Sequence, residues 1–432
     1  QSSAVPASTR SAALVTLAGE LGARAGEARS ARRRTALLGL HSLAAFAAKQ
    51  FKLFEGGFAN GTLEPDAQFP PAAIVEATIC QVAFDIDAFL RTLGQRDADN
   101  STAAMRDALN LADRLAADAL APAVQHKLIE ETAALTYFQK TPTVRLLPYV
   151  PLALIGIDLT AVQDPARLLA VAHESGHHVY RQLSVNYAAD LDKQVTDVIA
   201  ARAAAPDTAN QPPAWLLAWA EEVFADVYSV LVAGPVAGLS MQEMLMAGSP
   251  ALLLHDNGDH PIGVLRPEIA VLVLQKLAAH DPGSAARLQN IAARLHEQWR
   301  AYLAEQKLAG TFTPAGSDAP VSLAVAQEEL SRYIDTLLAG PLAPLARHPQ
   351  RDRWSKGLDA PSAPLSELYA QFAAARARLL GSEIPELTMV GSKKVAVTPQ
   401  VAGVKGGQRV VGEIGDPYLD GLRDDALDGK RT

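Results

Sequence analysis

The chain has 432 residues, of which 49% are hydrophobic and 20% charged, and its formal net charge at pH 7 is −8. One hydrophobic core rarely serves a chain of this length, so we expect two or three subdomains. The negative charge gives no electrostatic reason to expect a nucleic acid or an anionic membrane surface as a partner. One basic cluster, Arg29 with Arg32, Arg33 and Arg34, is interpreted as a solvated helix face.

Cys80 is the only cysteine, which excludes an intramolecular disulfide and thiolate zinc sites. Any metal must therefore be held by His, Asp or Glu side chains, and Cys80 itself is interpreted as a buried thiol. No apolar run reaches the roughly 18 to 20 residues that a membrane span needs, so we expect a soluble protein. The cytoplasm is favoured, a periplasmic or secreted location stays open, and the sequence does not indicate the oligomeric state.

Ala- and Leu-rich stretches dominate the first 140 residues and predict helices. Ser101 is the expected N-cap of one of them, and Pro122 is expected to begin the next. These predicted helices cover about 8–25, 31–51, a stretch after Pro71, 101–119 and 122–138.

The pattern changes at Thr141, where short runs of branched residues predict strands near 144–147 and 152–157. Asp164 and Pro165 then provide an N-cap and a first-turn proline for a helix that extends to about Leu183. Further helices are expected at about 188–205, 214–232, 267–279, 284–308, 321–338 and 366–380, and a weak hairpin or a disordered tail after Met389. The expected regions are 1–140, 141–270, 271–383 and 384–432.

Residues 173–177 read His-Glu-Ser-Gly-His, the HExxH pattern. Residues four apart share one face of a helix, so His173 and His177 can bind one metal ion together. Glu174 lies about 100° round the helix, where its carboxylate can take a proton from a metal-bound water. The alternative is a helix that carries two histidines by chance. The small Ser175 and Gly176 would let another element pack closely against the metal face.

The third ligand is predicted downstream, in the apolar segment that contains Glu222 and Asp226. These residues lie one turn apart, and charged side chains in an apolar stripe are costly unless paired or metal-bound. We expect Glu222 to bind the metal and Asp226 to accept the free N–H of a ligand histidine. Glu221 is interpreted as a solvated neighbour, although Glu221 or Asp226 could replace Glu222 as ligand.

The order of HExxH followed by Glu-x-x-x-Asp is similar to that of the gluzincin metallopeptidases. The later His260-Pro261, followed after four residues by Arg266, resembles the CAAX-type prenyl endopeptidase lineage. The composition and the predicted elements indicate a mainly α fold, with helical bundle subdomains and a small β element. The resemblance spans about 141–266 and implies a zincin-like catalytic core among these helices. It also implies that His260 and Arg266 lie near the metal and hold a substrate or transition-state oxygen. Those relatives carry transmembrane helices and this chain has none, so a prenylated or membrane-embedded substrate cannot be carried over.

Together these features predict a zinc peptidase that acts on a peptide or protein substrate, with Zn2+ on His173, His177 and Glu222 and with Glu174 as the base. The rival hypothesis is a catalytically silent binding or regulatory module with the same fold. Among the remaining residues, His178 is expected in solvent or beside the site, and His255 is a weaker candidate donor to the oxyanion. Tyr228 is expected in the core.

Overall fold

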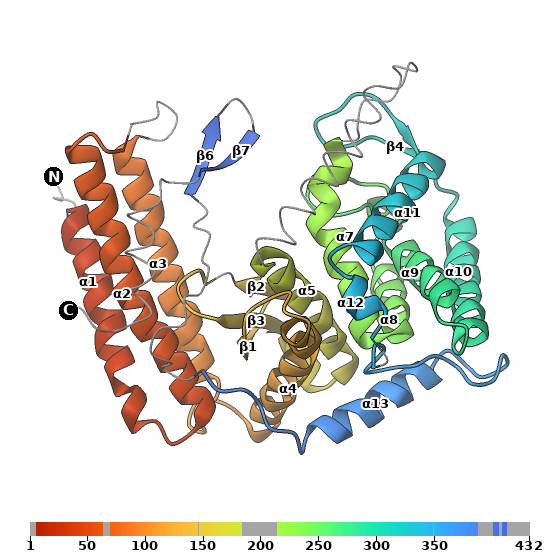
Figure 1. Cartoon of the computed structure of the whole chain (residues 1–432), viewed down its shortest axis with the longest axis horizontal. Helices are drawn as coiled ribbons and strands as arrows, with labels where there is room; N and C mark the ends of the chain where they lie inside the picture. Colours follow the sequence, from red (N-terminus) through yellow and green to blue (C-terminus); the bar gives the residue numbers. More distant parts are fainter. Residues whose placement is uncertain are drawn as a thin grey trace.

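The computed structural model describes residues 6–63, 70–145, 147–183, 214–348, 350–387, 401–405 and 408–412. Helices dominate these residues, with one three-stranded sheet and two two-stranded sheets, which confirms the mainly α fold. Helices α1 to α3 lie side by side at one end of the molecule, and α7 to α11 lie at the other (Figure 1). The three-stranded sheet and α5 lie between the two groups.

The first group contains α1 (Ala7–Ala23), α2 (Ala31–Ala59) and α3 (Pro71–Gly94), with the short 3-10 helix η1 (Arg24–Glu27) between α1 and α2. The Ser30 side chain caps α2 by accepting a hydrogen bond from the Arg33 backbone N–H. Cys80 is exposed on α3, so its interpretation as a buried thiol is wrong. The helix is half-buried, and residue 80 falls on its solvent side.

Helix α4 (Ala103–Gln125) corrects two local predictions. The N-cap is Thr102, whose side chain accepts from the Met105 N–H, and not Ser101. Pro122 does not begin a new helix, because it lies in the last turn of α4, where the chain soon leaves the helix anyway. The predicted helix up to Phe138 is also wrong, since strand β1 (Ala133–Gln139) occupies that segment.

Strand β3 (Leu152–Asp158) is the centre of a three-stranded sheet with the order β1-β3-β2. It pairs in parallel with β1 and antiparallel with β2 (Thr143–Arg145). Alternate residues of β1 and β3 belong to two hydrophobic clusters, one shared with α1 to α3 and the other with α4, α5 and α7. Because both faces are covered, β1 reads as a continuous apolar run that local sequence cannot distinguish from a buried helix.

Helix α5 (Ala170–Gln182) follows β3 through the 3-10 helices η2 (Leu159–Val162) and η3 (Pro165–Leu169). The Asp164 carboxylate accepts from the Ala166 N–H and caps η3, so the predicted N-cap starts a 3-10 turn before the α-helix begins. Helix α7 (Ala214–Ala233) ends at Gly234, whose φ of +71° is left-handed. A Cβ there would lie 1.9 Å from the Ser355 carbonyl oxygen, so only glycine fits.

The rest of the described chain is helical except for two small hairpins. Helix α8, which the sequence did not predict, continues directly from Gly234. The remaining elements are α8 (Pro235–Met246), η4 (Pro250–Leu252), α9 (Arg266–His280), α10 (Ala285–Gln306), β4 (Thr311–Phe312), β5 (Val321–Ser322), α11 (Leu323–Ala339), α12 (Ala343–Ala346), α13 (Glu367–Leu379), β6 (Val401–Lys405) and β7 (Gln408–Gly412). Strands β6 and β7 pair antiparallel, as the weak hairpin prediction expects. The predicted helix at 188–205 lies outside the described residues.

No helix in the described ranges is both long and apolar enough to cross a membrane.

Candidate metal centre

Helices α5 and α7 pack against each other and together supply the candidate metal centre. Gly176 of α5 faces Ala225 of α7, and a Cβ built on Gly176 would lie 2.7 Å from the Ala225 Cα. The absence of a side chain at this point lets the two helix backbones approach closely. The close approach brings the histidines of α5 to the carboxylates of α7.

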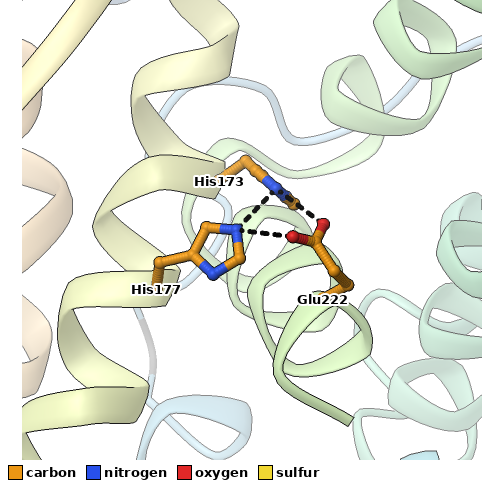
Figure 2. A group of neighbouring side chains, drawn as sticks. All are labelled: His173, His177 and Glu222. Atoms are coloured by element: carbon orange, nitrogen blue, oxygen red, sulfur yellow. Dashed lines mark hydrogen bonds and ion pairs between the residues drawn. The ribbon is translucent and has the colours of Figure 1, made fainter. Parts of the chain in front are cut away.

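His173, His177 and Glu222 converge on one point, as Figure 2 shows. The two Nε2 atoms lie 3.1 Å apart. Glu222 places Oε2 3.4 Å from the His173 Nε2 and Oε1 3.2 Å from the His177 Nε2. Ligand atoms at about 2.0 to 2.2 Å from a tetrahedral zinc ion are separated by about 3.3 Å, so the three donors fit such an ion with little movement.

Each histidine also meets a carboxylate at its other ring nitrogen. The His173 Nδ1 lies 2.9 Å from Asp226 Oδ1, so the carboxylate is beside the ring nitrogen where the sequence predicts it, but the two groups are not aligned for a hydrogen bond. The His177 Nδ1 lies 2.8 Å from Glu221 Oε1. A carboxylate on Nδ1 keeps that nitrogen protonated and leaves Nε2 free for a metal.

The interpretation of Glu221 as a solvated neighbour is therefore wrong. Its carboxylate contacts both His177 and the Arg181 guanidinium, which lie one turn apart on α5. The sequence carried a weak signal for this contact, because a histidine and an arginine four residues apart lie on one helix face, where one acidic side chain can contact both. Nothing in the sequence showed that α7 would present Glu221 to that face.

Electrostatics at the centre favour a cation. Burial by itself lowers the pKa of His173, but the carboxylates of Asp226 and Glu222 outweigh it and raise that pKa to about 10. Burial by itself raises the pKa of Glu222, but its contacts with His173, His177 and Arg266 outweigh burial and hold that pKa far below its usual range. The four carboxylates of Glu174, Glu221, Glu222 and Asp226 face the two guanidinium groups of Arg181 and Arg266. A bound metal ion takes the place of the proton that the raised pKa keeps on His173, so both imidazoles are neutral in the loaded centre. The side chains then carry an excess of two negative charges, which one divalent cation would balance.

Glu174 lies on the buried side of α5, and only 7% of the residue is exposed. Burial raises the pKa of its carboxyl group, and the neighbouring histidines partly offset that effect. A carboxylate with a raised pKa is a better proton acceptor at neutral pH than an exposed glutamate.

His260 and Arg266 both reach the centre. The His260 Nε2 lies 3.3 Å from Glu222 Oε1, its ring is 43% exposed, and its backbone N–H donates to the Asn257 side chain. The Arg266 side chain is 12% exposed and donates from Nε and Nη2 to the two oxygens of Asp226 at 3.0 and 2.9 Å. The Arg266 Nη2 also donates to Glu222 Oε2 at 3.3 Å. His260 thus lies on the solvent side of the centre, and Arg266 lies behind the carboxylates.

The other candidates lie elsewhere or play structural parts. His255 is exposed and forms no hydrogen bond or ion pair with the cluster among the described residues. His178 is expected in solvent or beside the site; it is 2% exposed, which excludes the first alternative, and burial lowers its pKa to about 4. Tyr228 is buried and donates its hydroxyl to the Ala119 carbonyl oxygen, which confirms its place in the core.

Comparisons with protein families, with curated proteins and with solved structures found no match to this chain. The chemistry of the centre therefore rests on its residues and their geometry. Two imidazoles and one carboxylate are the donor set of many catalytic zinc sites, in which a fourth position stays open for water or substrate.

Proposed function

We propose that the chain is a zinc-dependent peptidase that hydrolyses peptide bonds with Glu174 as general base. The observation that carries this proposal is the convergence of His173, His177 and Glu222 within 3.1 to 3.4 Å of one another, next to the buried Glu174. A histidine pair placed by chance on a helix would not be met by a glutamate from a second helix. It would also not have a carboxylate on each Nδ1.

Zinc held by His173, His177 and Glu222 would supply Lewis acidity, lowering the pKa of water and polarising a substrate carbonyl. Glu174 accepts the proton of the attacking water and then passes it to the leaving amine, so that the amine departs uncharged. Its raised pKa makes it a better acceptor of the water proton than an exposed glutamate.

His260 and Arg266 would have different parts in this scheme. His260 lies on the exposed side of Glu222, where its Nε2 can donate to the oxygen of a bound substrate. Arg266 already donates to Asp226 and Glu222. It therefore holds these two carboxylates in place and also balances part of their negative charge.

The experiment combines metal analysis with activity on the purified chain. We expect about one zinc per chain and cleavage within a broad peptide library. His173→Ala and His177→Ala should each lose the zinc, whereas Glu174→Gln should keep it and lose activity by about 10² to 10⁴-fold. His280→Ala is the control, because His280 lies exposed at the end of α9.

Full zinc content in both histidine variants would refute the metal site. A zinc-loaded protein that cleaves no member of the library would instead favour the binding module without catalysis.

A further inference from the structure

A cavity of about 410 Å³ lies where α2 begins and α3 ends, among elements that do not contribute to the metal centre. Four arginines line it, namely Arg29, Arg32, Arg33 and Arg96, together with the acidic Glu27 and Asp97. Three of these arginines belong to the basic cluster that the sequence interpretation assigned to a solvated helix face. Arg29 and Arg33 are exposed, as that interpretation expects, and together with the half-buried Arg32 they also line a recess of the size that binds small molecules.

Two of the arginines are fixed by a buried carboxylate behind the cavity wall. Asp113 of α4 is fully buried and accepts from Arg32 Nε at 2.8 Å and from Arg96 Nη2 at 2.7 Å. The backbone N–H of Thr136 in β1 donates to the same carboxylate at 2.8 Å. This network holds Arg32 and Arg96 in one geometry, so they form a rigid wall.

The other two arginines remain available. Arg29 and Arg33 are exposed and form no ion pair with any residue that the structure describes. The Asp97 carboxylate accepts a hydrogen bond from the Asp99 N–H at 3.1 Å, which does not remove its negative charge, so Glu27 and Asp97 are the two acidic groups of the lining that compete for these arginines. The cavity also opens at the start of the 29-residue helix α2, whose dipole adds partial positive charge.

We propose that this cavity binds the phosphate group of a small soluble molecule. A guanidinium presents a planar fork of donors that matches the oxygens of a phosphate. Arg29 and Arg33 supply two such forks, and neither is ion-paired with a residue in the described ranges. The rigid wall of Arg32 and Arg96 adds positive potential, and because these side chains are already ordered, binding would cost them no further conformational entropy. The recess is too small for a folded macromolecule, and the net charge of −8 opposes a polyanion.

The test is calorimetric titration of the full-length chain with inorganic phosphate and, separately, with glycerol phosphate. We expect a Kd of about 1 mM or lower for at least one of them. Arg29→Ala and Arg33→Ala should each weaken binding by about tenfold, since each removes one set of charge-assisted hydrogen bonds. Glu27→Gln should tighten binding, because it removes one of the two competing carboxylates.

Arg24→Ala is the matched control, because it removes the same charge from an exposed residue three positions before Glu27 that does not line the cavity. Its affinity should equal that of the unmodified chain. Equal weakening in Arg24→Ala would reduce the effect to general surface charge and overturn the proposal. Lack of binding by both probes, or stronger binding to vesicles that contain phosphatidic acid than to glycerol phosphate, would also overturn it.

Discussion

Replacing Gly176 by alanine would test the packing that builds the metal centre. The new Cβ would lie 2.7 Å from the Ala225 Cα and 3.1 Å from the Ala225 carbonyl oxygen. Both neighbours are backbone atoms, so no side chain can rotate away. Ordinary contact begins near 3.4 Å, so α5 and α7 must separate by about 0.7 Å.

This separation has two consequences with different magnitudes. Overpacking costs about 1 to 3 kcal/mol, which the better helix propensity of alanine offsets by about 1 kcal/mol. Zinc ligands must stay within about 0.5 Å of their productive positions, and here they come from both helices. We therefore expect the free energy of unfolding of the metal-free chain to change little or fall by up to about 2 kcal/mol. Zinc affinity should fall by about tenfold or more.

Two assays separate these effects: denaturant unfolding in the presence of a chelator, and zinc competition against a chromophoric chelator. Gly56→Ala in α2 is the matched control, because a Cβ there meets nothing within 4 Å. That variant should keep its zinc affinity and gain or retain stability. Unchanged zinc affinity in Gly176→Ala would refute the inference that the approach of α5 and α7 sets the ligand geometry.

Three further predictions concern the surroundings of the centre and one distant carboxyl group. Glu221→Gln should lower zinc affinity by about 10- to 100-fold while the metal-free chain stays folded, because it weakens the acceptor at the His177 Nδ1; an unchanged affinity would count against that contact. His260→Ala should lower the turnover number by about 10² to 10³-fold and keep the zinc. Arg266→Ala should lower the melting temperature and weaken zinc binding. Full activity with intact zinc in both variants would remove the two residues from the site. Burial raises the pKa of Asp352 to about 6 from 3.8, so the folded chain binds this proton more tightly than the unfolded chain. The stability that this group contributes is therefore fully present below about pH 4 and is lost as the pH rises to about 6, by up to about 3 kcal/mol. Asp352→Asn, which tolerates the local φ of +60°, should remove that pH dependence in denaturant titrations, and a persistent dependence would assign it to another group.

The sequence alone determined the features that depend on local spacing. The i,i+4 repeat of His173 and His177 required only a helix, and the prolines and capping residues around 164–165 placed one there within a few residues. Glu222 and Asp226 stood out because carboxylates in an apolar helix need partners, and the structure supplies those partners as His173, His177 and Arg266.

Only the tertiary structure decided the features that depend on which surfaces meet. Residues 133–139 read locally as part of a helix, and they form a strand because α1 to α3 cover one face and α4 the other. The sequence pattern indicated that Glu221 is solvated. It contacts His177 because α7 packs against α5 with the Glu221 side chain directed toward that helix. The local sequence pattern indicates which positions of a helix or strand are buried. The neighbour that buries each face is set by packing between segments far apart in the chain, and no local pattern contains that information.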